Sequence, residues 1–173
     1  LFGQLGIKDS DFVVTLSPVS RQPYKVWPAE RFAVIADWLV QKHQAKILFL
    51  FGPGEEHFID AVREAMKQKA LPDYDSPSLT ETLAILNKVD LHFGNDNGPR
   101  HFAVAGGTPT LAVFGRPWAV NWTPPEDAQH CALEYDPGCK NKCTYPECKL
   151  ECLHGVTVEA VQAELETMIK TFC

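Results

Sequence analysis

Long apolar runs are missing from this chain of 173 residues, although 45% of its residues are hydrophobic. No stretch approaches the roughly 18 consecutive apolar residues that a membrane-spanning helix needs. Concentrated positive charge is missing too, since the 16 Lys and Arg residues are scattered and the formal net charge is −6. Surfaces that bind nucleic acid gather basic residues on one face. We therefore expect a soluble protein without a nucleic-acid partner, which holds any anionic ligand at a local site.

Two common nucleotide-binding motifs are also absent. No G-x-G-x-x-G follows the first predicted strand, and no G-x-x-x-x-G-K-[ST] occurs in the chain. The first motif binds dinucleotides in redox enzymes, and the second cradles phosphates in P-loop hydrolases. Their absence argues against both classes of enzyme.

The length fits a single domain, since domains typically run to about 100–200 residues. The chain begins at Leu1 rather than Met, and its opening residues have neither the basic region nor the apolar core of a signal peptide. We expect residues 1–173 to form one domain cut from a longer protein. Within it we expect a cysteine-rich loop over residues 131–155 and a final amphipathic helix over residues 158–172.

Short strands and amphipathic helices alternate from the start of the chain to about His130, the pattern of a Rossmann-like α/β fold with a parallel sheet flanked by helices. The apolar runs predict strands at 13–16, 47–51, 91–94 and 110–114. Helices are expected from about 28, around 58–65, from a capping box at 78–81 to about 87, and through 102–105. Between Gly115 and Thr157 the composition is typical of a loop.

Four of the six cysteines fall within one short segment, as Cys139, Cys143, Cys148 and Cys152. Four thiolates are enough for a tetrahedral zinc or a metal cluster, but the spacing lacks the two-residue separations of the common zinc knuckles. A structural metal, disulfides formed on purification and inert free thiols all stay open. No other metal site or cofactor is predicted, and a disulfide framework distributed over the fold is not expected.

The segment 94–101, Gly-Asn-Asp-Asn-Gly-Pro-Arg-His, is the most distinctive in the chain. It follows a predicted strand and opens a helix, so its backbone amides and the helix dipole favour an anion such as a phosphate. Asp96, Asn97 and Gly98 stand at the turn, and His101 lies one turn into the helix. The alternatives are an Asx-turn that only caps the helix and, for His101, a buried histidine with satisfied hydrogen bonds.

Two further loops carry polar residues directly after predicted strands. Ser20, Arg21 and Lys25 lie between the first strand and the first helix, where the two cations could neutralise a diphosphate. Glu55 follows the second strand and could accept hydrogen bonds from ribose hydroxyls. The alternative for Arg21 and Lys25 is that both are solvated loop charges without a ligand. The alternative for Glu55 is an acid that only stabilises the first turn of a helix through the helix dipole. Because ligands of open parallel sheets bind at the carboxyl ends of the strands, we expect these loops to converge.

Taken in order, these segments resemble the ADP-heptose:lipopolysaccharide heptosyltransferase family. The resemblance rests on residues 17–18, 25–32, 52–55, 94–110, 113–115 and 122–124, and it extends over nearly the whole chain. It implies the C-terminal, donor-binding domain of an inverting GT-B glycosyltransferase, which transfers heptose from ADP-heptose to lipopolysaccharide core. A GT-B domain that uses another nucleotide sugar and a non-catalytic nucleotide-binding module are the alternatives.

The resemblance also implies roles for the donor-binding residues. Lys25 and Ser20 would hold the diphosphate, Glu55 would hold the ribose, and the backbone amides of Asn97 and Gly98 would contact the phosphates again. Asn97 stands where the family usually has serine or threonine, so a hydroxyl is lost while the amide is kept.

Asp96 would face the sugar or its phosphate, His101 would support the same loop, and Asp96 and Lys25 are the residues we expect to take part in catalysis. Arg21, also a donor-binding candidate, stands where some members have a second hydroxyl residue. These departures leave nucleotide binding intact and put the identity of the sugar in doubt.

The general base of the family is a carboxylate of the N-terminal domain, so the resemblance implies that this chain alone is inactive. An inverting transfer needs a base to take the proton of the acceptor hydroxyl, as well as charges that stabilise the departing diphosphate. The lipopolysaccharide acceptor would bind through the absent domain. The implied location is the cytoplasmic face of the bacterial inner membrane, with peripheral association only.

Overall fold

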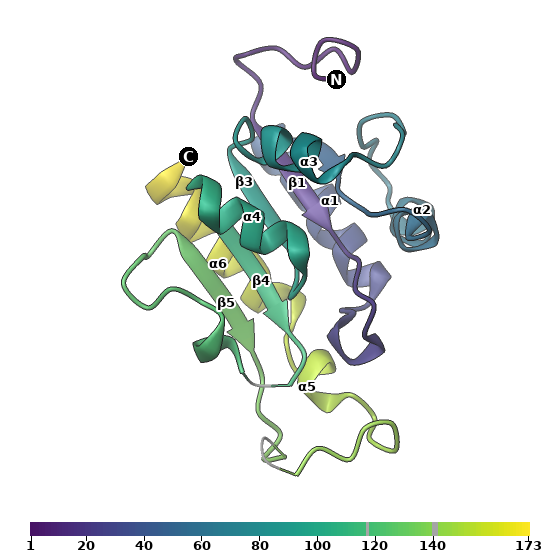
Figure 1. The fold of residues 1–173 in the computed structure, drawn as a ribbon, viewed down its shortest axis with the longest axis vertical. Helices are drawn as coiled ribbons and strands as arrows, with labels where there is room; N and C mark the ends of the chain where they lie inside the picture. Colours follow the sequence, from purple (N-terminus) through teal and green to yellow (C-terminus); the bar gives the residue numbers. More distant parts are fainter. Residues whose placement is uncertain (117, 140–141) are drawn as a thin grey trace.

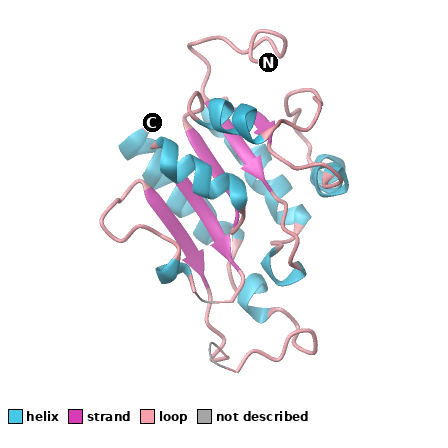
Figure 2. Cartoon of the chain, in the orientation of Figure 1, coloured by secondary structure: helices cyan, strands magenta, loops and turns pink. Residues whose placement is uncertain are grey.

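The computed structural model describes residues 1–116, 118–139 and 142–173. Its centre is a parallel sheet in the order β2-β1-β3-β4-β5, with helices on both faces (Figure 1, Figure 2). The strands are β1 (Val13–Ser17), β2 (Lys46–Phe49), β3 (Leu91–Asn95), β4 (Thr110–Phe114) and β5 (His130–Glu134). The predicted Rossmann-like α/β fold is confirmed.

Helices connect the strands and cover the sheet. They are α1 (Ala29–His43), α2 (Glu56–Ala65), α3 (Leu79–Leu86), α4 (Gly98–Gly106), α5 (Glu151–His154) and α6 (Val158–Phe172), with short 3-10 turns η1 (Pro23–Lys25) and η2 (Ala119–Asn121). In the described ranges, no helix combines the length and the apolar character needed to cross a bilayer.

Each face of the sheet has its own apolar layer, because successive strand residues point to opposite faces. Val14 and Leu16 of β1 pack on the side covered by α1, α2 and α6. Val13 packs on the other side, with Ile85 of α3 and Ala103 of α4. The strands β1, β3 and β4 are buried along their whole length. Strands buried on both faces need nearly continuous apolar residues, which explains why these were recognisable in the sequence.

The predicted capping box is also present at the start of α3. The Ser78 hydroxyl accepts a hydrogen bond from the amide of Glu81, and the Glu81 carboxylate accepts one from the amide of Ser78. The carboxylate also accepts a hydrogen bond from the Ser78 hydroxyl, at 2.7 Å. These contacts lower the pKa of Glu81.

The strand β5 was not predicted, and the expectation of a continuous loop from Gly115 to Thr157 is wrong. It pairs with β4 in parallel, with His130 opposite Thr110. β5 is one of the two edge strands, and unlike β2 at the other edge most of its residues are only half-buried, so it does not need an apolar run. Its sequence, His-Cys-Ala-Leu-Glu, also lacks the β-branched residues typical of strands.

Candidate functional site

The predicted site loops lie at the carboxyl ends of the strands. The loop after β1 carries Lys25 at the end of η1, and Asp96 directly follows β3. The Lys25 ammonium meets an Asp96 carboxylate oxygen at 2.5 Å. The lysine side chain is 30% exposed and the aspartate side chain 8%, so the ion pair is largely shielded from solvent on the aspartate side and partly open on the lysine side. Two residues 71 positions apart are therefore joined by an ion pair.

The first turn of α4 is fixed by the side chain of Asn97. Its carbonyl oxygen accepts from the amide of Arg100 at 3.4 Å and caps the helix. Its amide nitrogen donates to the Ser17 hydroxyl at 2.9 Å and to the carbonyls of Ser17 and Val19. Gly98, the first residue of the helix, is exposed. The capping interpretation of Asn97 is thus correct, and the same side chain also ties this turn to the loop after β1.

The backbone around Lys25 is held by neighbours that sequence reasoning did not identify. The carbonyl oxygen of the Asn95 side chain accepts from the amide of Trp27 at 3.0 Å, and the Trp27 indole donates to the carbonyl of Val156 at 3.0 Å. Gly115 approaches so closely that a Cβ there would overlap the Tyr24 carbonyl. The lysine is therefore presented by a loop packed onto the ends of β3 and β4.

Three other predicted residues line a separate open cleft of about 750 Å³, whose lining includes neither Lys25 nor Asp96. Ser20, Arg21 and Glu55 all border it, as do Pro23 and Val26, which flank Lys25 in the sequence. The Glu55 carboxylate accepts from the amide of Gly52 at 2.7 Å. The Ser20 hydroxyl accepts from the amide of Gln22 at 3.2 Å. The structure therefore brings these three residues together around one cleft, and the loop that carries Lys25 borders it.

His101 lies on the exposed side of α4, so its interpretation as a buried histidine is wrong. Its ring stands 5.6 Å from the ring of Trp122, centroid to centroid. Partial desolvation lowers the pKa of His101, and the charge of Arg100 acts in the same direction, while Asp96 opposes it. The histidine is thus within the electrostatic reach of the ion pair.

Arg100, like Asn95 and Trp27, is a residue near the site that the sequence analysis did not identify. Its side chain is fully buried, over the ring of Phe114 at 5.2 Å. The guanidinium donates to the carbonyl of Trp122 at 2.7 Å and to the Thr123 hydroxyl at 3.0 Å. Burial lowers the pKa of Arg100, and the nearby Asp96 carboxylate opposes that shift. The arginine therefore ties the segment after β4 to α4.

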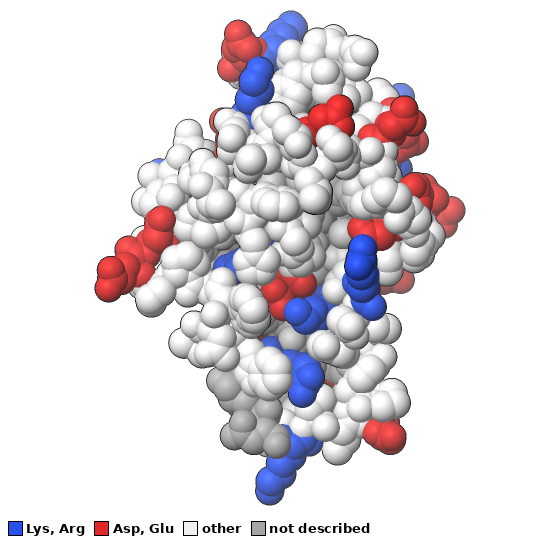
Figure 3. Space-filling view, viewed as in Figure 1, with Lys and Arg blue, Asp and Glu red and all other residues white. Residues whose placement is uncertain are grey.

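The surface around the site carries charge of both signs. In Figure 3, Lys and Arg side chains gather below α4, around a small acidic patch near the middle of this face. This arrangement agrees with the Lys25–Asp96 contact. In a protein with a formal net charge of −6, it supplies the local positive charge that an anionic ligand needs.

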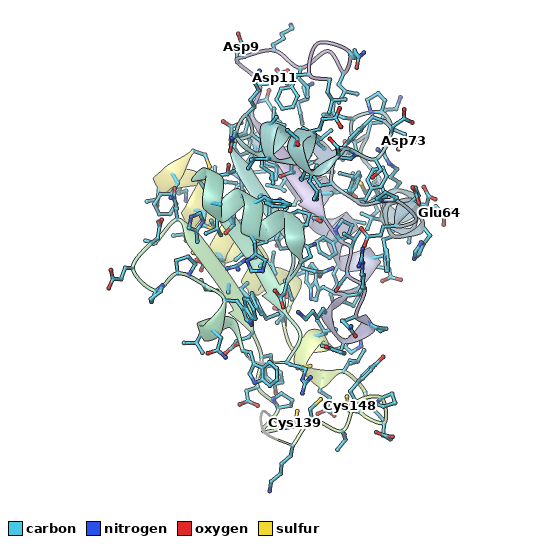
Figure 4. All side chains as sticks on the ribbon, in the orientation of Figure 1. Asp9, Asp11, Glu64, Asp73, Cys139 and Cys148 are labelled. Carbon is cyan, nitrogen blue, oxygen red and sulfur yellow. The ribbon has the colours of Figure 1, made fainter. Side chains whose placement is uncertain are left out.

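The cysteine segment lies beyond the sheet, at the end of the molecule far from the N-terminus (Figure 4). All six cysteines are free thiols. A cavity of about 350 Å³ in this segment is lined by four of the cysteines and two tyrosines, namely Cys139, Cys143, Cys148, Cys152, Tyr24 and Tyr145. In the described part of the chain, no group of three or more His, Cys, Asp or Glu side chains is arranged to hold a metal ion. The structural metal stays a hypothesis without support from this geometry.

Comparison with known sequences finds relatives for most of the chain. Residues 4–154 match the family described as glycosyltransferase family 9 (heptosyltransferase). Lipopolysaccharide heptosyltransferase 3 of Escherichia coli K12 is 28% identical over 123 residues, which cover 69% of this chain and 35% of the relative.

Solved structures share the fold. A glycosyl transferase family 9 protein from Veillonella parvula is 26% identical, with a TM-score of 0.77, and the match covers 98% of this chain and 49% of that one. The E. coli ADP-heptose lps heptosyltransferase II is 17% identical, with a TM-score of 0.78 and coverage of 98% and 50%. The chain thus spans about a third of the curated relative and about half of each solved chain.

Proposed function

The chain belongs to glycosyltransferase family 9, the heptosyltransferase family, and from this premise we propose that it is the donor-binding half of an inverting glycosyltransferase. The donor is ADP-heptose, the nucleotide sugar in the name of the E. coli relative with the same fold. The acceptor is the lipopolysaccharide core, in keeping with the name of the curated relative.

The observation that carries this proposal is the contact between Lys25 and Asp96 at the start of α4. A lysine cation and a helix N-terminus both attract a diphosphate. When the donor binds, Lys25 exchanges the Asp96 carboxylate for phosphate oxygens, and Asp96 is left to face the sugar. Catalysis by these two residues consists of stabilising the charge of the departing diphosphate and orienting the sugar.

In this proposal the cleft bordered by the Lys25 loop accommodates the rest of the nucleotide. In this proposal Ser20 and Arg21 contact the diphosphate and Glu55 contacts the ribose, and the support is that all three line the same cleft. The amides of Asn97 and Gly98 complete the phosphate contacts, and His101 supports this turn from α4. For Glu55 to accept from a ribose hydroxyl, it shares or releases its present hydrogen bond with Gly52.

The acceptor and its general base belong to the other half of the enzyme in this proposal. The solved relatives are about twice as long as the part that this chain matches. The complete enzyme works at the cytoplasmic face of the inner membrane, where it associates peripherally with its lipid-linked acceptor.

Nucleotide preference tests this proposal. We expect the chain to bind ADP more tightly than UDP, by about tenfold or more, which corresponds to about 1.4 kcal/mol. Isothermal titration calorimetry with both nucleotides measures the difference. Equal affinities, or tighter binding of UDP, would favour a GT-B domain for another nucleotide sugar. No binding of either nucleotide would remove the donor-binding role.

A further inference from the structure

Two tryptophans next to the candidate site are unusually exposed. The segment after β4 leaves 39% of Trp118, 72% of Val120 and 55% of Trp122 open to solvent. By contrast, Trp27 is fully buried. Large apolar side chains that cluster on a surface commonly mark a place where something binds.

Trp122 is the one that the structure holds against the site. Its indole lies beside the His101 ring on α4, with 5.6 Å between the ring centroids. His101 is in turn close enough to Lys25 and Asp96 for both charges to act on it. Trp118 instead stacks with Arg116, whose guanidinium carbon is 4.5 Å from the indole centroid. Trp122 thus packs beside the first turns of α4, the helix that begins two residues after Asp96.

The position of Trp122 is fixed by a buried cation. Arg100 donates to the Trp122 carbonyl and to the Thr123 hydroxyl from a fully buried position. Burying a guanidinium is unfavourable unless its donors are satisfied, and here Nη1 and Nη2 have partners in the segment after β4 whereas the buried Nε has none. The hydrogen bonds from Arg100 fix the position of the Trp122 backbone, while the Trp122 indole remains open to solvent.

An exposed aromatic face beside a carboxylate suits one class of ligand in particular. A sugar ring presents C–H groups on one face and hydroxyls around its edge. The apolar face packs on an aromatic ring, while the hydroxyls hydrogen-bond to groups such as a carboxylate or an imidazole. Trp122, His101 and Asp96 supply this combination next to the cation that we assign to the diphosphate.

We propose that the Trp122 indole packs against the sugar ring of the bound nucleotide sugar, and that Arg100 is the positioning residue that sets the place of this indole. The proposal rests on the donor-binding function proposed above, and it names the group that distinguishes the nucleotide sugar from the bare nucleotide. Trp122 contacts the sugar, whereas Lys25 contacts the phosphates. The two ligands ADP and ADP-heptose therefore separate the two roles.

Calorimetric titration of the chain and its Trp122→Ala variant with ADP and with ADP-heptose tests this assignment. We expect the variant to lose about five- to tenfold in affinity for ADP-heptose, while its affinity for ADP stays within about twofold. Trp122→Phe keeps an aromatic face and should retain most of the affinity. Val120→Ala, an exposed apolar residue of the same segment, is the matched control and should bind both ligands like the parent.

Arg100→Lys tests the positioning role, since lysine keeps the charge but cannot make both hydrogen bonds in the same geometry. We expect a selective loss for ADP-heptose, as in Trp122→Ala. Where Arg100→Lys fails to fold, Thr123→Val removes only one of the two hydrogen bonds and should show a smaller loss of the same kind. A purely structural role for Arg100 would lower the melting temperature without changing the ratio of the two affinities.

Each outcome separates this inference from the function on which it rests. If the parent binds ADP but Trp122→Ala loses both ligands equally or loses neither, the sugar assignment is wrong and the donor-binding function stands. If the parent binds neither ligand, both fail. Tryptophan fluorescence adds an independent reading, because a change that ADP-heptose causes and ADP does not should disappear in Trp122→Phe.

Discussion

At the scale of single residues, Lys25 is the side chain on which the proposed phosphate site depends most. It is partly exposed and already holds an anion, the Asp96 carboxylate, at 2.5 Å. Lys25→Ala should weaken ADP binding by roughly one to two orders of magnitude, because a charge-assisted hydrogen bond contributes about 1.5–3 kcal/mol. Calorimetry measures the loss. Lys88 is an exposed lysine just before β3, at the amino ends of the strands and away from the site, so Lys88→Ala should bind ADP like the parent. Equal affinities of Lys25→Ala and the parent would remove the phosphate assignment.

Asp96 competes with the ligand for the same cation, so its substitution should act in the opposite direction on the bare nucleotide. Asp96→Asn keeps the size of the side chain and removes its charge. We expect ADP to bind about two- to fivefold more tightly, as Lys25 no longer has a carboxylate partner to exchange. ADP-heptose should gain less than ADP or lose affinity, because the carboxylate faces the sugar. Equal weakening of both ligands would show that Asp96 only maintains the shape of the loop.

At the scale of elements, a buried row of threonine and histidine crosses four strands of the sheet. Thr15, His92, Thr110 and His130 occupy matched positions on β1, β3, β4 and β5. Hydrogen bonds join Thr15 to His92 at 3.0 Å and Thr110 to His130 at 3.2 Å. Burial, with a smaller contribution from the charge of Arg100, lowers the pKa of His92 to about 3. The sheet therefore keeps this imidazole neutral under conditions in which the unfolded chain would protonate it.

This row predicts how stability depends on pH. Below about pH 6.5 the unfolded chain binds a proton at His92, whereas the folded protein does so only near its lowered pKa of about 3. The folded state therefore loses stability as pH falls through this window, by up to about 1.4 kcal/mol per pH unit. Urea unfolding between about pH 6 and pH 4 should show a shallower decline for His92→Gln than for the parent. His154→Gln, at an exposed histidine, should follow the parent; parallel declines for His92→Gln and the parent would contradict the assignment.

The elements also differ in how far the sequence alone predicts them. The inner strands were predictable because burial on both faces requires a continuous apolar run. The capping box of α3 was predictable because its two residues, Ser78 and Glu81, lie three positions apart in the chain. The edge strand β5 was not, since half-buried residues carry little apolar signal. Arg100 and Asn95 were missed for a different reason. Their partners, Trp122 and Trp27, lie 22 and 68 positions away, so the roles exist only once the fold brings the segments together.

At the scale of the whole molecule, the proposed function assigns the donor site to this chain and the general base to the other half of the enzyme. Two carboxylates stand in the described part of the site. Asp96 is paired with Lys25, and Glu55 accepts a hydrogen bond from the amide of Gly52 in its own loop. A base must reach the acceptor hydroxyl with a free lone pair. In the proposed donor complex Asp96 faces the donor sugar and Glu55 faces the ribose, so neither carboxylate is directed at an acceptor hydroxyl.

We therefore expect the isolated chain to bind ADP-heptose but not to transfer heptose. The purified chain, incubated with ADP-heptose and a lipopolysaccharide acceptor, should give no glycosylated product above a blank without protein. The E. coli ADP-heptose lps heptosyltransferase II provides the positive control for the assay. Binding of ADP by the same preparation shows that the chain is folded, which separates a missing base from a misfolded site. Sustained transfer by the chain alone would mean that it contains its own base, and Asp96 would then be the first carboxylate to test, because it lies where the sugar is expected.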